Sequence, residues 1–300
     1  MRETNDGLTC GLVALNSIMA LAHSSLAYAT VALGNTALRV PVYHSLLDVQ
    51  INYASGGVGS GDVRGWALVP GSESDVVFHL PLTLACAAFF VISGAFHAGN
   101  VLVWRESYLR GVRDARCLSR WIEYSLSAPI MAAALIGYTT SSVLFLNLVA
   151  IFGLTATTMF FGHLQEVVAR PGPGDTWRPS RAVERYMPHA LGWVPQGFAW
   201  FLILYQFARG FGARGVDPRT GEERGAPSFV LYIVYGEALL FWSFGLVQIA
   251  VLCRPPSKYW QGEVAYQVLS LASKAVLGGA MLANVLMLGS FAEAFERQRP

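Results

Sequence analysis

The sequence has little charge and almost no lysine. Only 13% of its 300 residues are charged and 54% are hydrophobic, whereas a soluble domain usually has about 25% charged residues. This balance argues against an ordinary soluble domain and favours a chain whose apolar runs cross a bilayer. The net charge of +2 is too small to suggest binding to nucleic acid. Among 21 basic residues, only Lys258 and Lys274 are lysines.

Disulfide, metal and nucleotide motifs are also missing. The four cysteines (Cys10, Cys86, Cys117 and Cys253) lie far apart, and no CxxC or Cys/His ligand spacing occurs. The pattern supports neither a disulfide framework nor a zinc site, and free cysteines are readily buried as small apolar residues. Without a nucleotide loop, a hydrolase elbow or a metal cluster, the sequence predicts a protein that is not an enzyme.

Seven apolar segments are long enough to span a bilayer core, which requires roughly 20 helical residues. The first follows a short polar start and has no evident small-residue cleavage site, so we expect it to be retained. The sequence therefore predicts an all-α, multi-pass membrane protein in which residues 1–300 form one seven-helix domain. The expected spans are 8–33, 76–102, 115–138, 143–166, 187–210, 228–253 and 263–292.

The longest connection, residues 34–75, contains two β-prone pieces. "LRVPVYHSL" and "RGWALVP" flank the Gly/Ser-rich "ASGGVGSGD", a pattern typical of a hairpin. We expect the hairpin to pack over one mouth of the bundle, and a disordered loop is the alternative.

Basic residues in the loops predict the orientation of the bundle. Connections on the side of the N-terminus hold twelve Lys and Arg, and those on the opposite side hold eight. Because basic loops stay inside, the bias places the N-terminus in the cytoplasm. The arginine-rich "RESYLRGVRDAR" then forms a solvated cytoplasmic connection or a contact for anionic headgroups or a partner.

Lys274 lies near the middle of the seventh span. A charged lysine there costs about 2.5–3.5 kcal/mol and requires an interior partner. Two explanations compete: a structural or transport ion pair, and a Schiff-base lysine whose amine reacts with an aldehyde in a dry pocket. Glu123, in the first turns of the third span, is at a comparable depth and is the best-placed carboxylate. The alternative for Glu123 is an interfacial pair with Arg120.

Two histidines lie inside spans, His23 in the first and His97 in the second. Each can be a hydrogen-bonded residue of the bundle interior. Together with Glu123 they can instead form a polar pocket that stores a proton, since imidazole titrates near neutrality.

Motifs in several spans resemble the heliorhodopsins, the inverted-topology branch of the retinal-binding microbial rhodopsins. "RWIEYSLSAPIM" (120–131) and "EVAYQVLSLASKAVL" (263–277) are the specific matches, and "FGHLQE" (161–166) and "FVLYIVYGEALLFWSFGLVQ" (229–248) agree with them. The resemblance covers nearly the whole chain. It implies an extracellular hairpin, a cytoplasmic N-terminus, a place in the cell membrane and a homodimer.

The resemblance also implies roles for single residues. All-trans retinal is expected on Lys274, with Glu123 as its counterion and Ser270 hydrogen-bonding near that pair. Met131 and Phe241 are expected to line the chromophore. The proton-storing cluster on the cytoplasmic side of the Schiff base is expected to contain His23, His97 and Gln248.

Glu237 departs from the family pattern, because the resemblance leads us to expect an apolar residue in the outer half of the sixth span. Intramembrane acids often mark ion pathways, so Glu237 is a possible proton path to the outside. The alternative is a Glu that hydrogen-bonds Tyr235 or Tyr205 or reaches the interface by snorkelling.

The sequence therefore predicts a light-absorbing retinal protein. Isomerisation of the chromophore moves a proton locally and feeds a long-lived signalling state, whose partner the sequence does not identify. A light-gated passive proton or ion channel that uses Glu237 is the second hypothesis. A retinal-free transporter with Lys274 and Glu123 as an ion pair is the third.

Overall fold

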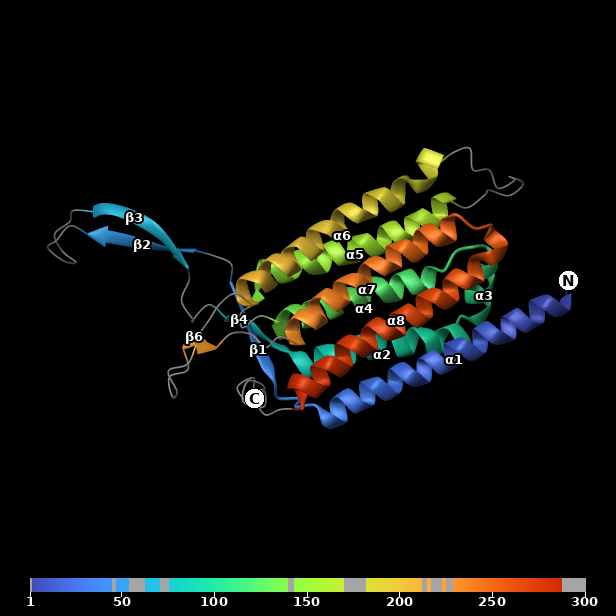
Figure 1. Cartoon of the computed structure of the whole chain (residues 1–300), viewed down its shortest axis with the longest axis horizontal. Helices are drawn as coiled ribbons and strands as arrows, with labels where there is room; N and C mark the ends of the chain where they lie inside the picture. The colour runs from blue at the N-terminus through green and yellow to red at the C-terminus, as the bar shows by residue number, and fades with distance from the viewer. Residues whose placement is uncertain are drawn as a thin grey trace.

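The chain folds into a bundle of long helices with small β-structures at one end (Figure 1). The computed structural model describes residues 2–44, 47–53, 63–70, 76–139, 143–169, 182–211, 215–216, 223–224 and 229–287. Within these ranges seven helices have more than twenty residues. They are α1 (Arg2–Leu33), α2 (Leu82–Leu102), α4 (Leu118–Thr139), α5 (Phe145–Ala169), α6 (Ala182–Phe211), α7 (Phe229–Leu252) and α8 (Tyr259–Met281).

Five segments in the described part of the chain are long and apolar enough to cross a membrane by length and composition alone. They are Gly7–Leu33, Leu82–Leu102, Phe145–Ala169, Val230–Leu252 and Pro256–Asn284. Helices α4 and α6 fall outside this set, but both pack against α5 within the same bundle. The fold is thus the mostly helical membrane bundle that the sequence predicts.

The structure changes some expected boundaries. The second expected span begins six residues too early, because Val76–Pro81 form strand β4 and α2 starts at Leu82. In the seventh expected span, the regular α-helix α8 ends at Met281, and a π-helical turn, Leu282–Leu286, follows it. The arginine-rich connection after α2 contains a short helix, α3 (Arg105–Arg113), which the sequence analysis did not predict.

The strands pair differently from the expected hairpin. Strand β2 (Leu47–Tyr53) pairs antiparallel with β3 (Val63–Pro70). The earlier strand β1 (Arg39–Tyr43) pairs instead with β4, and β5 (Val143–Leu144) adds to β1 in parallel. "RGWALVP" therefore pairs with the residues just after "LRVPVYHSL", and the glycine-rich piece between β2 and β3 lies outside the described residues. A further short pair joins β6 (Gly215–Val216) to β7 (Glu223–Arg224).

The mouth of the bundle is closed by β1 and its partners. Val40 and Val42 alternate with more exposed residues along β1, as expected for a strand with one buried face, and both belong to the main hydrophobic core. The β2–β3 pair projects away from this end (Figure 1). The expectation that the β2–β3 hairpin packs over the mouth is therefore wrong. The buried side of β1 covers this end of the bundle instead.

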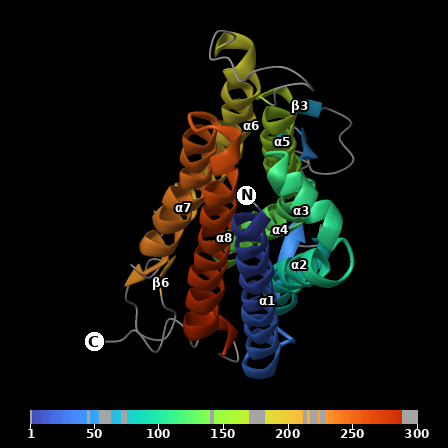
Figure 2. The same cartoon turned by 90° about the vertical axis from the view of Figure 1, so that its right-hand side faces the viewer.

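Helices α1, α2, α4 and α8 surround the part of the bundle interior that contains Lys274 and Glu123. Figure 2 shows α8 beside α1, and α1 packs along α2. Gly94 of α2 permits this closeness, because a Cβ there would come within 3.1 Å of the Ser24 hydroxyl on α1. At the end where α1 begins, α3 adds Tyr108, Leu109 and Val112 to a second apolar cluster.

Candidate functional site

Lys274 and Glu123 meet in the interior of the bundle. Lys274 Nζ lies 3.2 Å from Glu123 Oε1, and each residue is only 2% exposed. The two side chains come from α8 and α4, so a residue pair separated by 151 positions becomes an ion pair. In water such a pair would contribute little, but a buried charge without a partner is strongly destabilising. This depth agrees with the expectation that the lysine faces the interior.

Two serines complete the surroundings of the pair. Lys274 Nζ donates to Ser270 Oγ at 2.7 Å, one helical turn away on α8. Ser93 Oγ on α2 donates to Glu123 Oε1, a contact that the analysis missed. The centroid of the Tyr124 ring lies 5.2 Å from Lys274 Nζ. A buried amine, a carboxylate and two hydroxyls thus converge on one point.

The two histidines lie beside this pair. His97 is one turn beyond Ser93 on α2, and its ring stacks on His23 with centroids 5.5 Å apart. His97 Nδ1 lies 2.8 Å from Asn16 Oδ1 on α1. His23 is fully buried, and among the described residues neither of its ring nitrogens has a hydrogen-bond partner. The structure therefore brings the two histidines together.

A hydrogen-bonded path continues from His97 toward the end where α1 begins. Asn16 Nδ2 donates to the Tyr108 hydroxyl at 3.0 Å, and that hydroxyl lies 3.2 Å from Glu263 Oε1. Burial raises the pKa of Tyr108, which lies in α3 outside the spans. The phenol therefore keeps its proton and donates a hydrogen bond to the Glu263 carboxylate.

Arg120 ends this path, and it does not pair with Glu123. Its guanidinium donates to Glu166 of α5 and to Glu263 of α8, and all three side chains are buried. The Tyr259 hydroxyl donates to the same Glu166 carboxylate at 2.7 Å. An Arg120–Glu123 pair is therefore excluded as the alternative for Glu123. Glu166 forms one of the two ion pairs of Arg120.

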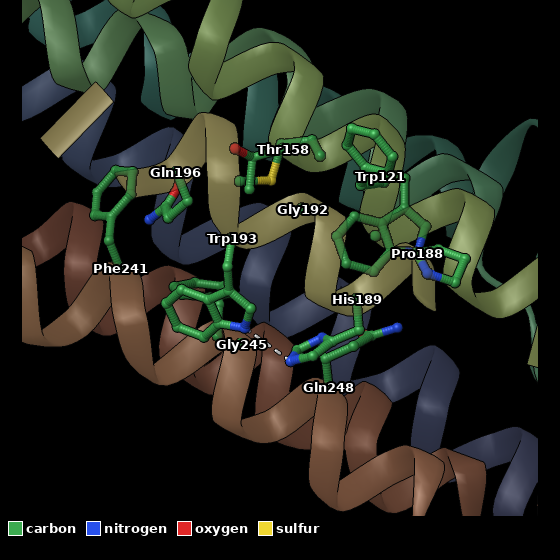
Figure 3. Close-up of a pocket in the computed structure, with 14 residues that line it drawn as sticks. Trp121, Thr158, Pro188, His189, Gly192, Trp193, Gln196, Phe241, Gly245 and Gln248 are labelled. Atoms are coloured by element: carbon green, nitrogen blue, oxygen red, sulfur yellow. Dashed lines mark hydrogen bonds between the residues drawn. The ribbon is translucent and has the colours of Figure 1, made fainter. Parts of the chain in front are cut away.

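Aromatic residues line a pocket inside the helical bundle. We call it the lateral pocket; it lies between α4, α5, α6 and α7 and is lined mainly by apolar side chains (Figure 3). Phe241 borders it and packs on Trp200, with ring centroids 5.4 Å apart. Met131 is buried in the core cluster against which Phe241 packs. Lining residues used below are Trp121, Trp193, Gln196, Phe241, Gly245 and Gln248.

Gln248 and Glu237 lie elsewhere on α7. Gln248 accepts a hydrogen bond from Tyr266 and lines the lateral pocket, and no contact joins it to the two histidines in the described structure. Glu237 is fully buried, and neither carboxylate oxygen has a hydrogen-bond partner among the described residues. Tyr235 and Tyr205 are both more than half exposed. Glu237 therefore neither bonds these tyrosines nor reaches the interface.

Comparison with known proteins identifies a family for this arrangement. A sequence model of the heliorhodopsin family matches residues 12–286, which is more than half of the chain. A search of curated proteins gave no match.

Proposed function

Because this chain belongs to the heliorhodopsin family of retinal-binding, light-absorbing membrane proteins, we propose that it holds all-trans retinal as a protonated Schiff base on Lys274. The observation that carries the proposal is the buried Lys274–Glu123 pair. The amine of Lys274 condenses with the aldehyde, and the aldehyde oxygen leaves as water. The mostly apolar lining of the lateral pocket suits a polyene.

The residues around Nζ have separate tasks in this proposal. Bound retinal supplies the absorption of light and the isomerisation that follows. Glu123 balances the positive charge in a region of low dielectric, where an unpaired cation would be unstable. Ser93 orients the Glu123 carboxylate, and Ser270 holds the nitrogen on the other side.

The hydrogen-bonded path that starts at His97 can hold the proton that leaves the Schiff base, on the N-terminal side of Lys274. His97 lies one turn beyond Ser93 on α2 and stacks on His23 of α1, and Asn16 and Tyr108 continue toward Glu263. We propose that a proton displaced by light stays in this buried network and produces the long-lived signalling state. Imidazole side chains suit this task, because a neutral ring offers one nitrogen that can accept a proton.

The orientation and assembly follow the sequence and the family resemblance. We propose a homodimer in the cell membrane with a cytoplasmic N-terminus. The greater number of basic residues in the connections on the N-terminal side supports this direction. The buried Arg120 network would then face the cytoplasm, where a signalling partner can respond to it.

The Glu123→Gln protein is expected to absorb at longer wavelength than the parent after addition of all-trans retinal. Glutamine keeps the shape of the side chain but removes the negative charge beside Lys274, so the positive charge spreads further along the polyene. The measurement is a visible spectrum of both purified proteins. Glu106→Gln, on the exposed side of α3, is the matched control and keeps the parent spectrum. An unchanged band in Glu123→Gln would contradict the counterion assignment.

A light-gated passive proton channel is a second candidate function, and Glu237 is the observation that favours it. A buried carboxyl group without a partner is stable only when it is protonated, and such groups can accept and pass on protons. Glu237 lies on α7, in the part of that helix nearer the hairpin end of the bundle. It could therefore continue a proton path from the Lys274 pair toward the outside.

Illumination of cells that express the protein tests this second function. A channel that uses Glu237 gives photocurrents whose direction reverses with voltage, and Glu237→Gln reduces them by at least tenfold. Glu184→Gln, at an exposed acid in the first turn of α6, serves as the control and keeps the current. Silence of the parent at all voltages rejects the channel and leaves the photosensory function.

A further inference from the structure

Gln196 has an unused hydrogen-bond acceptor in the lateral pocket. The residue is only 5% exposed, and its Oε1 has no partner among the described residues. Its neighbours in the pocket are mostly apolar, including Phe241 and Trp193. A buried acceptor without a donor is unfavourable, so the amide indicates a ligand that brings a donor.

The position of Gln196 along the bundle matches the depth of Lys274. Tyr266 on α8 bonds Gln248 on α7, so these two residues lie at one level. Lys274 is eight residues further along α8, about 12 Å at 1.5 Å per residue. Because α7 runs antiparallel to α8, the level of Lys274 on α7 is eight residues before Gln248, which is next to Phe241. Figure 3 places Gln196 toward the Phe241 end of the pocket and Gln248 toward the His189 end.

Small residues face large ones in the walls of this pocket. A Cβ on Gly162 would come within 2.2 Å of the Trp121 ring, and a Cβ on Gly245 within 2.4 Å of the Trp193 ring. The glycines therefore let the indole rings pack closely against the helices that form the walls. An apolar ring can stack on such walls.

Two oxygens at this end, on Thr158 and Gln196, are acceptors that can bind a hydroxyl donor. Thr158 uses its proton on the Leu154 carbonyl at 3.0 Å, so the oxygen of Thr158 is left with lone pairs, as is Gln196 Oε1. A ring hydroxyl can donate to either acceptor. A plain hydrocarbon ring leaves both oxygens without a donor.

We propose that the lateral pocket binds a hydroxylated isoprenoid ring and that Gln196 accepts a hydrogen bond from the ring hydroxyl. The proposal rests on the proposed attachment of retinal to Lys274. The ring can be that of the chromophore itself, as a ring-hydroxylated retinal, or that of a separate carotenoid that enters between α6 and α7. Both sources present the same chemistry to Gln196.

Competition between two aldehydes tests the proposal. The apoprotein is mixed with equal amounts of all-trans retinal and all-trans 3-hydroxyretinal, and the bound chromophores are released by hydroxylamine and quantified. One hydrogen bond to a neutral group predicts a preference of roughly three- to tenfold for the hydroxylated aldehyde. Gln196→Leu, which keeps the volume, loses this preference. Gln248→Leu, at the other end of the pocket, keeps it.

A second arm separates the two sources. Retinal-loaded protein is mixed with a dihydroxylated carotenoid, and circular dichroism in the carotenoid band reports ordered binding. An induced signal that Gln196→Leu abolishes, together with equal uptake of both aldehydes, assigns the site to a separate carotenoid. Equal uptake without such a signal overturns the proposal, and so does a preference that only Gln248→Leu removes. Failure of either aldehyde to give a visible band contradicts the proposed function instead.

Discussion

The Lys274→Ala protein is expected to stay colourless when all-trans retinal is added, whereas the parent gains a visible band that hydroxylamine bleaches. No other lysine can replace Lys274, because Lys258 is the only other one and lies in the short helix before α8. Without the amine no imine forms, and free retinal absorbs in the near ultraviolet. The measurement is an absorption spectrum of each purified protein before and after hydroxylamine.

Lys258→Ala provides the control for the loss of colour. Its side chain is exposed, so the variant should fold, bind retinal and bleach as the parent does. A Lys274→Ala protein that takes up retinal with the parent colour would disprove the covalent attachment. If Lys274→Ala fails to fold, a shift of the band in Ser270→Ala still tests the site, because Ser270 contacts Nζ directly.

The Arg120→Met protein is expected to lose about 3–5 kcal/mol of stability, the usual loss when one partner of a buried ion pair is removed. Arg120 is the cation shared by Glu166 and Glu263, and the substitution leaves two buried carboxylates without it. The guanidinium also stacks on Tyr266, 4.1 Å from the ring centroid. Thermal denaturation of the pigment, followed by loss of its visible band, measures the effect.

Two further variants show whether charge explains this loss. Arg113→Met removes an exposed arginine from α3 and should change stability by less than about 0.5 kcal/mol. Adding Glu166→Gln and Glu263→Gln to Arg120→Met removes the two orphaned charges and should restore part of the stability. A denaturation temperature of Arg120→Met equal to that of Arg113→Met would contradict the role of the network.

The long helices could be predicted because their cause is local. Each apolar run satisfies its backbone internally as a helix, which a membrane requires, and the expected and observed bounds of α4 to α7 agree within a few residues. The strands were harder. Val76–Pro81 is mostly apolar and could therefore be the first turns of a membrane helix. Its pairing with Arg39–Tyr43 makes it a strand. Such pairing depends on residues far apart in sequence.

The site shows the same division. Lys274 and Glu123 could be predicted because a charge in an apolar run is conspicuous and needs a partner. Ser93 could not, since a serine in a helix gives no such signal and acts only through its contact with Glu123. The alternative pair of Arg120 with Glu123 is wrong for a related reason: Glu123 is near in sequence, but both carboxylate partners of Arg120 lie on other helices.

By itself, the sequence determined that the chain crosses a membrane in several helices and that one lysine must be paired inside them, because transfer free energies depend on composition along the chain. Only the tertiary structure decided which carboxylates meet which cations, that Gln248 lies apart from the histidines, and that Glu237 has no partner among the described residues. These contacts depend on the relative rotation and depth of packed helices. Side chains from many segments set those quantities together, so no single segment encodes them.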